Sequence, residues 1–287
     1  MPSFVQLLPL QAGRLGPGRE KLPMSHSLTE AEFDRLTARS PAVLTAEERA
    51  ALEPYRVRRA VFLAAGFGSR LRPITGHTPK PLVRVRGRRI IDTLLDACLG
   101  AGIGEIYIVR GHLAGQFDAL LEAYPMVRFL DNPFYPEANN ISSALCARHL
   151  LSNAYVLEAD LLLAQPALIQ PYQYRSNFLA FPTAAADDWC FTVRDGIITE
   201  EKLGGRDCWQ MVGISYWGEA DGQRLAADLA AVWEEPEGRT RYWEQVPLDF
   251  RREHYRVAVR ACKPSDVTEI DTLEELQALD SRYKEEV

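Results

Sequence analysis

The sequence lacks any long apolar run. Its longest, over residues 60–67, falls far short of the roughly 20 residues that a membrane-spanning helix needs, so we expect no association with a membrane. The start of the chain also lacks the positively charged segment and the small-residue cleavage site of a secretory signal. We therefore expect the protein to act in the cytoplasm.

Paired cysteines are lacking as well. The five cysteines lie far apart and none belongs to a C-x-x-C pair; they are Cys98, Cys146, Cys190, Cys208 and Cys262. This spacing argues against both a structural zinc site and a disulfide framework. We expect buried free thiols.

Acidic residues are absent from one segment of an otherwise acidic chain. Residues 56–89 contain ten Lys or Arg and no Asp or Glu, whereas the whole chain has a net charge of -6 and the remainder therefore carries -16. A general nucleic-acid binder is more often basic overall, so this distribution favours a small polyanion, such as a nucleoside triphosphate. Four of the arginines alternate along a predicted hairpin and are interpreted as a solvated face: Arg84, Arg86, Arg88 and Arg89.

We expect two parts in the chain, an extension over residues 1–57 and one domain over residues 58–287. Residues 1–26 show no periodicity and are predicted to form a flexible tail. Two short helices are then predicted from capping boxes, Ser27 with Glu30 and Thr45 with Glu48. Such a pair resembles part of a helix-turn-helix, but its acidic side chains favour a packing appendage over a DNA-binding unit.

From residue 58 onward, strands alternate with helices. Strands are predicted at 60–64, 105–109, 127–130 and 155–157, and helices at 91–101, 116–123 and after Asn139 or Asn140. This order predicts an α/β fold, with a doubly wound, mostly parallel mixed sheet. After Pro182 the sequence becomes rich in strands, with a turn at Asp195-Gly196, and helices near 222–233 and 272–280 flank a last strand at 255–260. We expect the β-rich part to form a substrate subregion.

The segment after the first predicted strand carries a pattern of glycine and basic residues. It reads Gly66-Phe67-Gly68-Ser69-Arg70-Leu71-Arg72-Pro73-Ile74-Thr75, with Pro79-Lys80-Pro81 further on. Glycines let backbone N–H groups approach phosphate oxygens, while Arg70 and Lys80 supply positive charge. A dinucleotide fingerprint would need glycine at position 71, and a Walker A loop would need Gly-Lys-Ser/Thr. The sequence satisfies neither.

This G-x-G-x-R-x-x-P-x-T…P-K signature resembles that of nucleotidyltransferases that join a nucleoside triphosphate to a phosphorylated small molecule. Within that family the chain resembles bacterial CTP:phosphocholine cytidylyltransferases from about Arg59 to Leu279. Four more stretches carry the resemblance: residues 139–143 (NNISS), 158–160 (EAD), 213–217 (GISYW) and 269–271 (EID). It implies the nucleotide-diphospho-sugar transferase-like fold. Sugar-1-phosphate members share only the first loop so clearly, and they usually have Thr where this chain has Ser69.

The resemblance implies an in-line attack of the acceptor's phosphate oxygen on the α-phosphorus of CTP, with release of pyrophosphate. Lys80 would contact the α-phosphate and Arg70 the departing phosphates. Asn140 and Ser142 would read the cytosine edge, although Asn140 alone fits a helix cap equally well. Further donors to the nucleotide would come from the loop: Ala64, Ala65, Gly66, Gly68 and Ser69.

Joining two anions requires charge neutralisation, for which Mg²⁺ with carboxylate ligands is the expected agent. The resemblance implies Asp160, Glu269 and Asp271 as metal ligands. From the residues alone, Asp160 could form a turn or cap a helix, Asp271 could cap the final helix with Glu274 behind it, and Glu269 could be an exposed strand residue.

The second half of the chain places aromatic residues beside acids: Asp188, Trp189, Tyr216, Trp217, Tyr242, Trp243 and Glu244. A quaternary ammonium cannot donate hydrogen bonds and is held by aromatic faces and negative charge, so these residues are predicted to form a choline cage. Any one of the aromatic residues could instead belong to the core. The acids could equally bind a primary amine, and Leu161 stands where relatives commonly have a polar residue.

We therefore predict a Mg²⁺-dependent cytidylyltransferase that joins CTP and phosphocholine to give CDP-choline. The alternatives are 2-aminoethylphosphonate or a sugar 1-phosphate as acceptor, or a regulator that only senses a nucleotide. The four charged residues Arg70, Lys80, Asp160 and Asp271 speak against a pure sensor, which would not need all of them.

Overall fold

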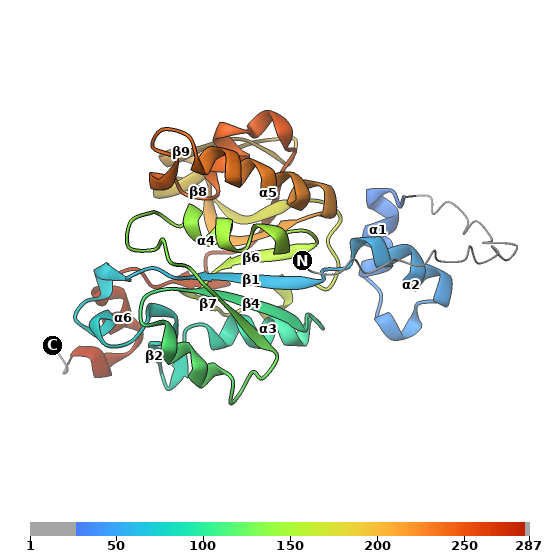
Figure 1. Ribbon diagram of the computed structural model, residues 1–287. Helices are drawn as coiled ribbons and strands as arrows, with labels where there is room; N and C mark the ends of the chain where they lie inside the picture. Colours follow the sequence, from blue (N-terminus) through green and yellow to red (C-terminus); the bar gives the residue numbers. More distant parts are fainter. Residues whose placement is uncertain (1–26, 285–287) are drawn as a thin grey trace, which may run out of the picture.

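The computed structural model describes residues 27–284, so the tail predicted over residues 1–26 lies outside the described residues. At the centre is a seven-stranded sheet in the order β10-β8-β9-β6-β1-β4-β5 (Figure 1). Strands β6, β1, β4 and β5 run parallel, whereas β9 is antiparallel to both β6 and β8. The strands are β1 (Arg59–Ala64), β4 (Glu105–Arg110), β5 (Val127–Asp131), β6 (Ala154–Glu158), β8 (Asn177–Arg194), β9 (Ile197–Trp217) and β10 (Ala258–Ala261).

Helices cover both faces of the sheet (Figure 1), and strand β1 shows why. Phe62 points into a hydrophobic cluster with α3 (Asp92–Gly100), while Val61 points into a second cluster with α4 (Ile141–Cys146) and α5 (Glu219–Trp233). Successive side chains of a strand alternate between faces, so a strand that is apolar at five consecutive positions, residues 60–64, needs cover on each side. The predicted doubly wound, mostly parallel mixed sheet is confirmed.

The helix predicted at 116–123 differs from expectation. It is a 3₁₀ helix over Ala114–Leu120, in which the N–H of Gln116 donates to the carbonyl of Leu113 three residues back, at 2.9 Å. The apolar periodicity marked the buried face correctly, since Phe117 and Leu120 are buried, but periodicity over so short a segment does not distinguish the two helix types.

The strand-rich segments beyond Pro182 belong to one long hairpin of β8 and β9. Its turn is the predicted Asp195-Gly196 pair, and both residues have positive φ, 49° and 74°. Two positive φ values match the right-handed twist of the flanking strands, which is why a two-residue hairpin favours Asp-Gly. The outer half of this hairpin forms one wall of the site described below.

Short strands bring the end of the chain to the carboxyl edge of the sheet. Strand β7 (Leu161–Leu163) pairs antiparallel with β11 (Val267–Glu269), so that Leu161 lies opposite Glu269. This pairing places α6 (Leu273–Leu279) beside the end of β6. Strands β2 (Arg84–Val85) and β3 (Arg88–Arg89) form the predicted basic hairpin.

In its described part, the extension before the sheet contains α1 (Glu30–Thr37) and α2 (Ala46–Leu52), which share a small apolar core. The Thr45–Glu48 capping box is confirmed, but the first box was placed wrongly: it is Thr29 with Glu32, because Thr29 is the residue directly before the helix. In Figure 1 the extension lies where β1 begins, at the end of the sheet opposite the glycine-rich loop. None of the helices in the described part of the chain is long and apolar enough to cross a membrane.

Candidate active site

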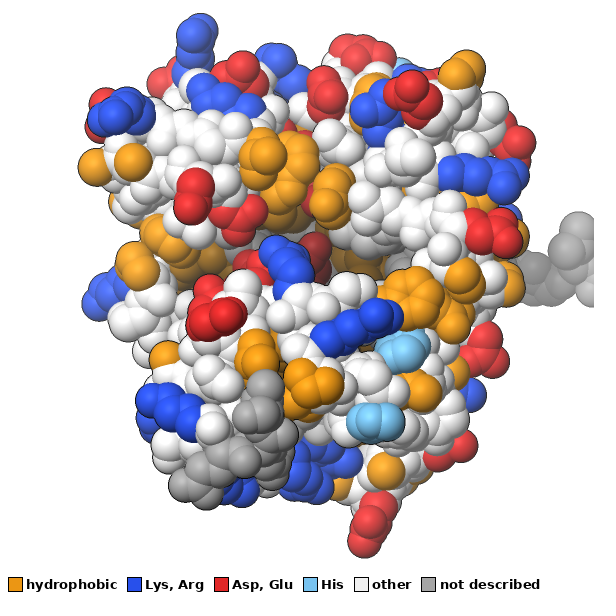
Figure 2. Space-filling view, turned by 90° about the vertical axis from the view of Figure 1, so that its left-hand side faces the viewer, with side chains coloured by type: hydrophobic (Ala, Val, Ile, Leu, Met, Phe, Trp, Pro, Cys, Tyr) orange, Lys and Arg blue, Asp and Glu red, His pale blue; other side chains and the backbone are white. Residues whose placement is uncertain are grey.

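A cavity of about 640 Å³ opens at the carboxyl ends of β1 and β6. Its walls are the glycine-rich loop after β1, the start of α4, the end of β6, the outer part of the β8–β9 hairpin and the segment around Tyr242. Figure 2 shows this face of the molecule hollowed, with basic side chains at the rim of the hollow and acidic ones behind them. Open α/β sheets bind their ligands at this edge, so the cavity is the candidate active site.

Gly68 explains why the loop signature has its spacing. Its φ of 60° lies in the left-handed region that disfavours side chains, and a Cβ there would come within 3.0 Å of Thr75 and 3.1 Å of Lys80. The hydroxyl of Thr75 donates to the carbonyl of Gly68 at 2.8 Å. The glycine, threonine and lysine of the signature therefore pack against one another and fix the position of the lysine.

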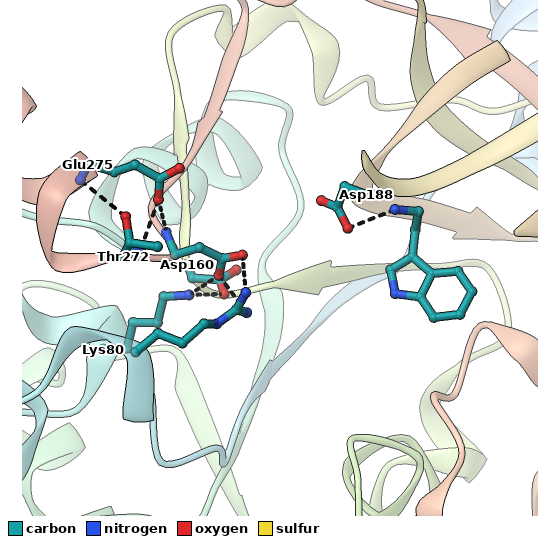
Figure 3. Close-up of polar contacts among 8 residues, drawn as sticks. Lys80, Asp160, Asp188, Thr272 and Glu275 are labelled. Carbon is teal, nitrogen blue, oxygen red and sulfur yellow. Dashed lines mark hydrogen bonds and ion pairs between the residues drawn. The ribbon is translucent and has the colours of Figure 1, made fainter. Parts of the chain in front are cut away.

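Lys80 lies between two carboxylates (Figure 3). Its Nζ donates to Asp160 Oδ2 at 2.7 Å and to Asp271 Oδ1 at 2.8 Å, and the residue is only 8% exposed. Burial alone would disfavour the charged ammonium, but the two carboxylates outweigh it, so the pKa of Lys80 lies above its ordinary value. Lys80 is thus held as a cation that faces the cavity.

Arg70 is the second cation of this group. Its guanidinium contacts both oxygens of Asp271, at 2.8 and 2.9 Å, while most of the side chain stays exposed. A planar guanidinium that binds a carboxylate through two nitrogens can bind a phosphate in the same way. Asp271 therefore orients both predicted phosphate-binding side chains.

At the start of α6, other residues form the helix cap, so the carboxylate of Asp271 is available to Lys80 and Arg70. The cap of the helix is Thr272, which forms a capping box with Glu275, and the N–H of Asp271 also donates to Glu275 at 2.7 Å (Figure 3). The alternative in which Asp271 caps the helix with Glu274 is therefore wrong, because the cap lies one residue further along. The carboxylate of Asp271 contacts Lys80 and Arg70 instead.

Three carboxylates converge beside Lys80. Oxygens of Glu158, Asp160 and Glu269 lie within 4.8 Å of one another, and Asp160 Oδ1 has no hydrogen-bond partner. Burial and the neighbouring charges of Asp160 and Glu158 raise the pKa of Glu269 to about 9. Carboxylates held this close need a compensating cation, and oxygen ligands are those that Mg²⁺ prefers. The residues therefore fit a divalent metal ion.

Glu158 is the member of this cluster that the metal prediction missed. The predicted set was Asp160, Glu269 and Asp271, although the EAD stretch already placed Glu158 two residues before Asp160, on the same face of the chain. Burial raises the pKa of Glu158 well above its usual range, and the charges of Asp160 and Glu244 add to this. Its carboxylate lies against Gly213, where a Cβ would come within 2.4 Å of an oxygen.

The predicted nucleotide-binding residues line the same cavity: Ala64, Ala65, Gly66, Gly68, Ser69, Asn140 and Ser142. The side chain of Asn140 does not cap α4; its Oδ1 accepts from the N–H of Trp243 at 2.8 Å. Ser142 donates to the carbonyl of Asn139 and accepts from Asn132. Both side chains are therefore positioned by contacts of their own.

Phe67 and Tyr135 also line the cavity, although the sequence predicted no role for either of them. Their ring centroids lie 5.1 Å apart, and Phe67 is 37% exposed, which is high for a large apolar side chain. Phe67 occupies a variable position of the loop signature. Nothing in the signature distinguishes it from any other residue there.

Four of the seven residues predicted to bind the acceptor lie at the cavity. Asp188, Trp189, Tyr242 and Glu244 line the cavity, and the rings of Trp189 and Tyr242 meet edge to face at 5.5 Å. Asp188 lies across the cavity from Lys80 in Figure 3, with its carboxylate accepting from the N–H of Trp189 at 2.7 Å.

The prediction that Tyr216, Trp217 and Trp243 face the substrate is wrong, because they belong to the core. All three are buried, and Trp217 packs against Phe178 and Trp243 and donates to Ser215 at 3.0 Å. For Tyr216 and Trp217 the reason is that β9 ends between β6 and β8 inside the sheet, so both of its faces are covered there. Trp243 is buried because it stacks on Phe178, with ring centroids 5.8 Å apart. The aromatic part of the predicted cage is reduced to Trp189 and Tyr242.

Comparison with known proteins agrees with this geometry. The model of the MobA-like NTP transferase domain matches residues 60–232, which include the glycine-rich loop, Lys80 and Asp160. The chain belongs to this family. The resemblance inferred from the G-x-G-x-R-x-x-P-x-T signature is confirmed, and the protein is a nucleotidyltransferase.

Its relatives in the family include cytidylyltransferases. The 2-aminoethylphosphonate cytidylyltransferase of Lancefieldella rimae is 34% identical over 228 residues, 78% of this chain and 92% of the relative. The choline-phosphate cytidylyltransferase of Streptococcus pneumoniae is 29% identical over 233 residues, 79% of this chain and 99% of the relative. The solved structure of CTP:phosphocholine cytidylyltransferase from Streptococcus pneumoniae has a TM-score of 0.73 at 27% identity, covering 79% of this chain and 99% of that one.

Proposed function

We propose that this nucleotidyltransferase transfers a cytidylyl group from CTP to a small acceptor with a phosphate or phosphonate at one end and a cationic nitrogen at the other. Phosphocholine, the acceptor predicted from the sequence, and 2-aminoethylphosphonate both fit this description. The observation that carries the proposal is the division of the cavity. Lys80, Arg70 and the carboxylate cluster line it together with Asp188, Trp189, Tyr242 and Glu244, and Figure 3 shows Lys80 with Asp160 at one side and Asp188 at the other.

The chemistry follows from the first side of the cavity. Lys80 would stabilise the α-phosphate as charge moves through the transition state, and Arg70 would hold the departing β- and γ-phosphates. Asp160, Glu158 and Glu269 would hold Mg²⁺, which when bound supplies neutralisation of the phosphate charges. Asp271 would orient Lys80 and Arg70 before the nucleotide arrives. The loop N–H groups from Ala64 to Ser69 would then fix the triphosphate.

The second side of the cavity selects the acceptor. Carboxylates beside aromatic rings attract a cation, and the relatives that match over most of their length are named for nitrogen-containing acceptors, so a sugar 1-phosphate is a poorer fit. We also propose that residues 58–287 are the nucleotidyltransferase domain and that residues 1–57 are an appendage.

The test is pyrophosphate release from CTP and Mg²⁺ with a panel of phosphocholine, phosphoethanolamine, 2-aminoethylphosphonate and glucose 1-phosphate. We expect turnover with at least one nitrogen-containing acceptor and little with glucose 1-phosphate. Replacing CTP by ATP, GTP or UTP should lower the rate. Silence with every acceptor would refute the proposal, and a shift of DNA mobility in a gel would then favour the regulator.

A further inference from the structure

A buried acidic pair lies behind the acceptor side of the cavity. Glu244 lines the cavity yet is only 2% exposed, and its Oε2 has no hydrogen-bond partner. Glu201, on β9, lies close enough for its charge to act on Glu244, and both oxygens of Glu201 are buried without a partner. The mechanism of nucleotidyl transfer gives no task to these three oxygens.

An unpartnered buried carboxyl group is costly, since it has lost its water and gained nothing in return. Such groups are therefore rare in folded proteins, and each one calls for a partner. Because Glu244 lines the cavity, a bound ligand can supply that partner. The ligand must bring hydrogen-bond donors, and a positive charge would favour the ionised carboxylate.

The two head groups considered above differ in this respect. A primary ammonium carries three N–H donors, whereas a trimethylammonium carries none and depends on aromatic faces. Only two aromatic side chains, Trp189 and Tyr242, remain on the cavity wall out of the five that the sequence suggested. The acceptor side therefore combines a reduced aromatic lining with one buried acceptor, Glu244 Oε2, that has no partner within the protein.

We propose that the cationic end of the acceptor is a primary ammonium group, and that Glu244, backed by Glu201, is the residue that selects it. This inference rests on the proposed function and narrows its substrate class. Asn140 positions Glu244, since it contacts both the Glu244 carboxylate and the N–H of Trp243. Trp189 and Tyr242 would enclose the carbon chain between the ammonium and the phosphorus group.

The electrostatics of the pair support the same conclusion. Burial and the charge of Glu201 raise the pKa of Glu244 to about 8, and burial and the charge of Asp249 raise that of Glu201 to about 8. Glu158 also lies near this pair, because the charge of Glu244 contributes to the raised pKa of Glu158. Without ligand the pair is therefore largely protonated near pH 7, and a bound ammonium would ionise it.

The test compares phosphoethanolamine with phosphocholine, which differ only in the three methyl groups on nitrogen. We expect kcat/KM for phosphoethanolamine and 2-aminoethylphosphonate to exceed that for phosphocholine by roughly 10- to 100-fold, the worth of hydrogen bonds to a charged group. Glu244→Gln should reduce this preference at least severalfold. The matched control is Glu234→Gln, an exposed glutamate, which should keep the preference.

Binding to the wild-type protein gives a second readout that does not depend on the variant's folding. Calorimetry in buffers of different ionisation enthalpy, in the presence of CTP with a non-hydrolysable α,β-linkage, should show more proton release for 2-aminoethylphosphonate than for ethylphosphonate, which has the same acid but no ammonium group. Equal proton release for the two ligands would overturn this inference. A preference for phosphocholine, or an unchanged preference in Glu244→Gln, would overturn this inference and leave the proposed function intact. Absence of pyrophosphate release with every acceptor would overturn both.

Discussion

Replacing Lys80 with methionine keeps the length of the side chain and removes its charge. In the wild-type protein Nζ lies 2.7 Å from Asp160 and 2.8 Å from Asp271, and both carboxylates are largely shielded from water. The Lys80→Met variant would leave these carboxylates facing Glu158 and Glu269 without their common cation. We therefore expect a loss of both stability and turnover.

The size of each loss follows from the geometry. Removing one partner of a buried ion pair typically costs about 3–5 kcal/mol, and because Asp271 keeps Arg70 we expect about 2–3 kcal/mol here. Loss of one preorganised cation at the transition state should lower kcat by roughly 10²- to 10³-fold. Added Mg²⁺ should raise the free energy of unfolding of the variant more than that of the wild type, since it would replace the missing cation among the carboxylates.

Urea unfolding with and without Mg²⁺, together with pyrophosphate release, would measure these effects. Lys263→Met provides the matched control, because Lys263 is exposed and its side chain contacts none of the site residues named above. Equal stability of wild type and Lys80→Met in the absence of Mg²⁺, or a kcat within threefold of wild type, would refute the role assigned to Lys80.

Three further predictions concern other parts of the molecule. Trp217→Ala should lower the free energy of unfolding by about 3–5 kcal/mol, whereas Trp189→Ala should raise the acceptor KM by roughly 3- to 30-fold with little effect on unfolding; the opposite pattern would restore Trp217 to the substrate site. Asp160→Asn should weaken Mn²⁺ binding, measured by electron paramagnetic resonance, by about tenfold or more, and unaltered binding would remove Asp160 from the metal site. Because the pKa of Glu201 rises from 4.5 to about 8 on folding, the native state binds the extra proton between these values, so this group's contribution to stability is full below pH 4.5 and is lost as the pH rises through 8. Glu201→Gln should flatten that decline in urea unfolding at pH 5 and pH 8, and an identical decline would contradict it.

Residues close together in the sequence were predicted well. The contacts among Gly68, Thr75 and Lys80 span one short loop, so a single signature contains all of them. Strand β1 was recognisable because a short run of apolar residues between polar flanks is typical of a strand buried on both faces. In these segments the local pattern and the tertiary structure impose the same requirement.

Residues whose role depends on distant pairing were predicted less well. Trp217 and Trp189 both lie within three residues of an acid, and only the position of β9 between β6 and β8 buries Trp217 fully and leaves Trp189 at the cavity. Glu201 was not singled out, because it meets Glu244 through the folding of the β8–β9 hairpin against the segment after Tyr242. Glu158 joined the metal cluster through the β7–β11 pairing, which brings Glu269 next to it.

The contact between Gly213 and Glu158 limits how this acceptor site can change over evolution. A side chain as small as that of alanine at position 213 would come within 2.4 Å of the Glu158 carboxylate and push it toward the other acids. New acceptor specificities cannot therefore be explored by enlarging this residue. Variation must come from other positions, such as Leu203 and Tyr242, whose exposed side chains border the cavity and contact none of the phosphate-binding residues.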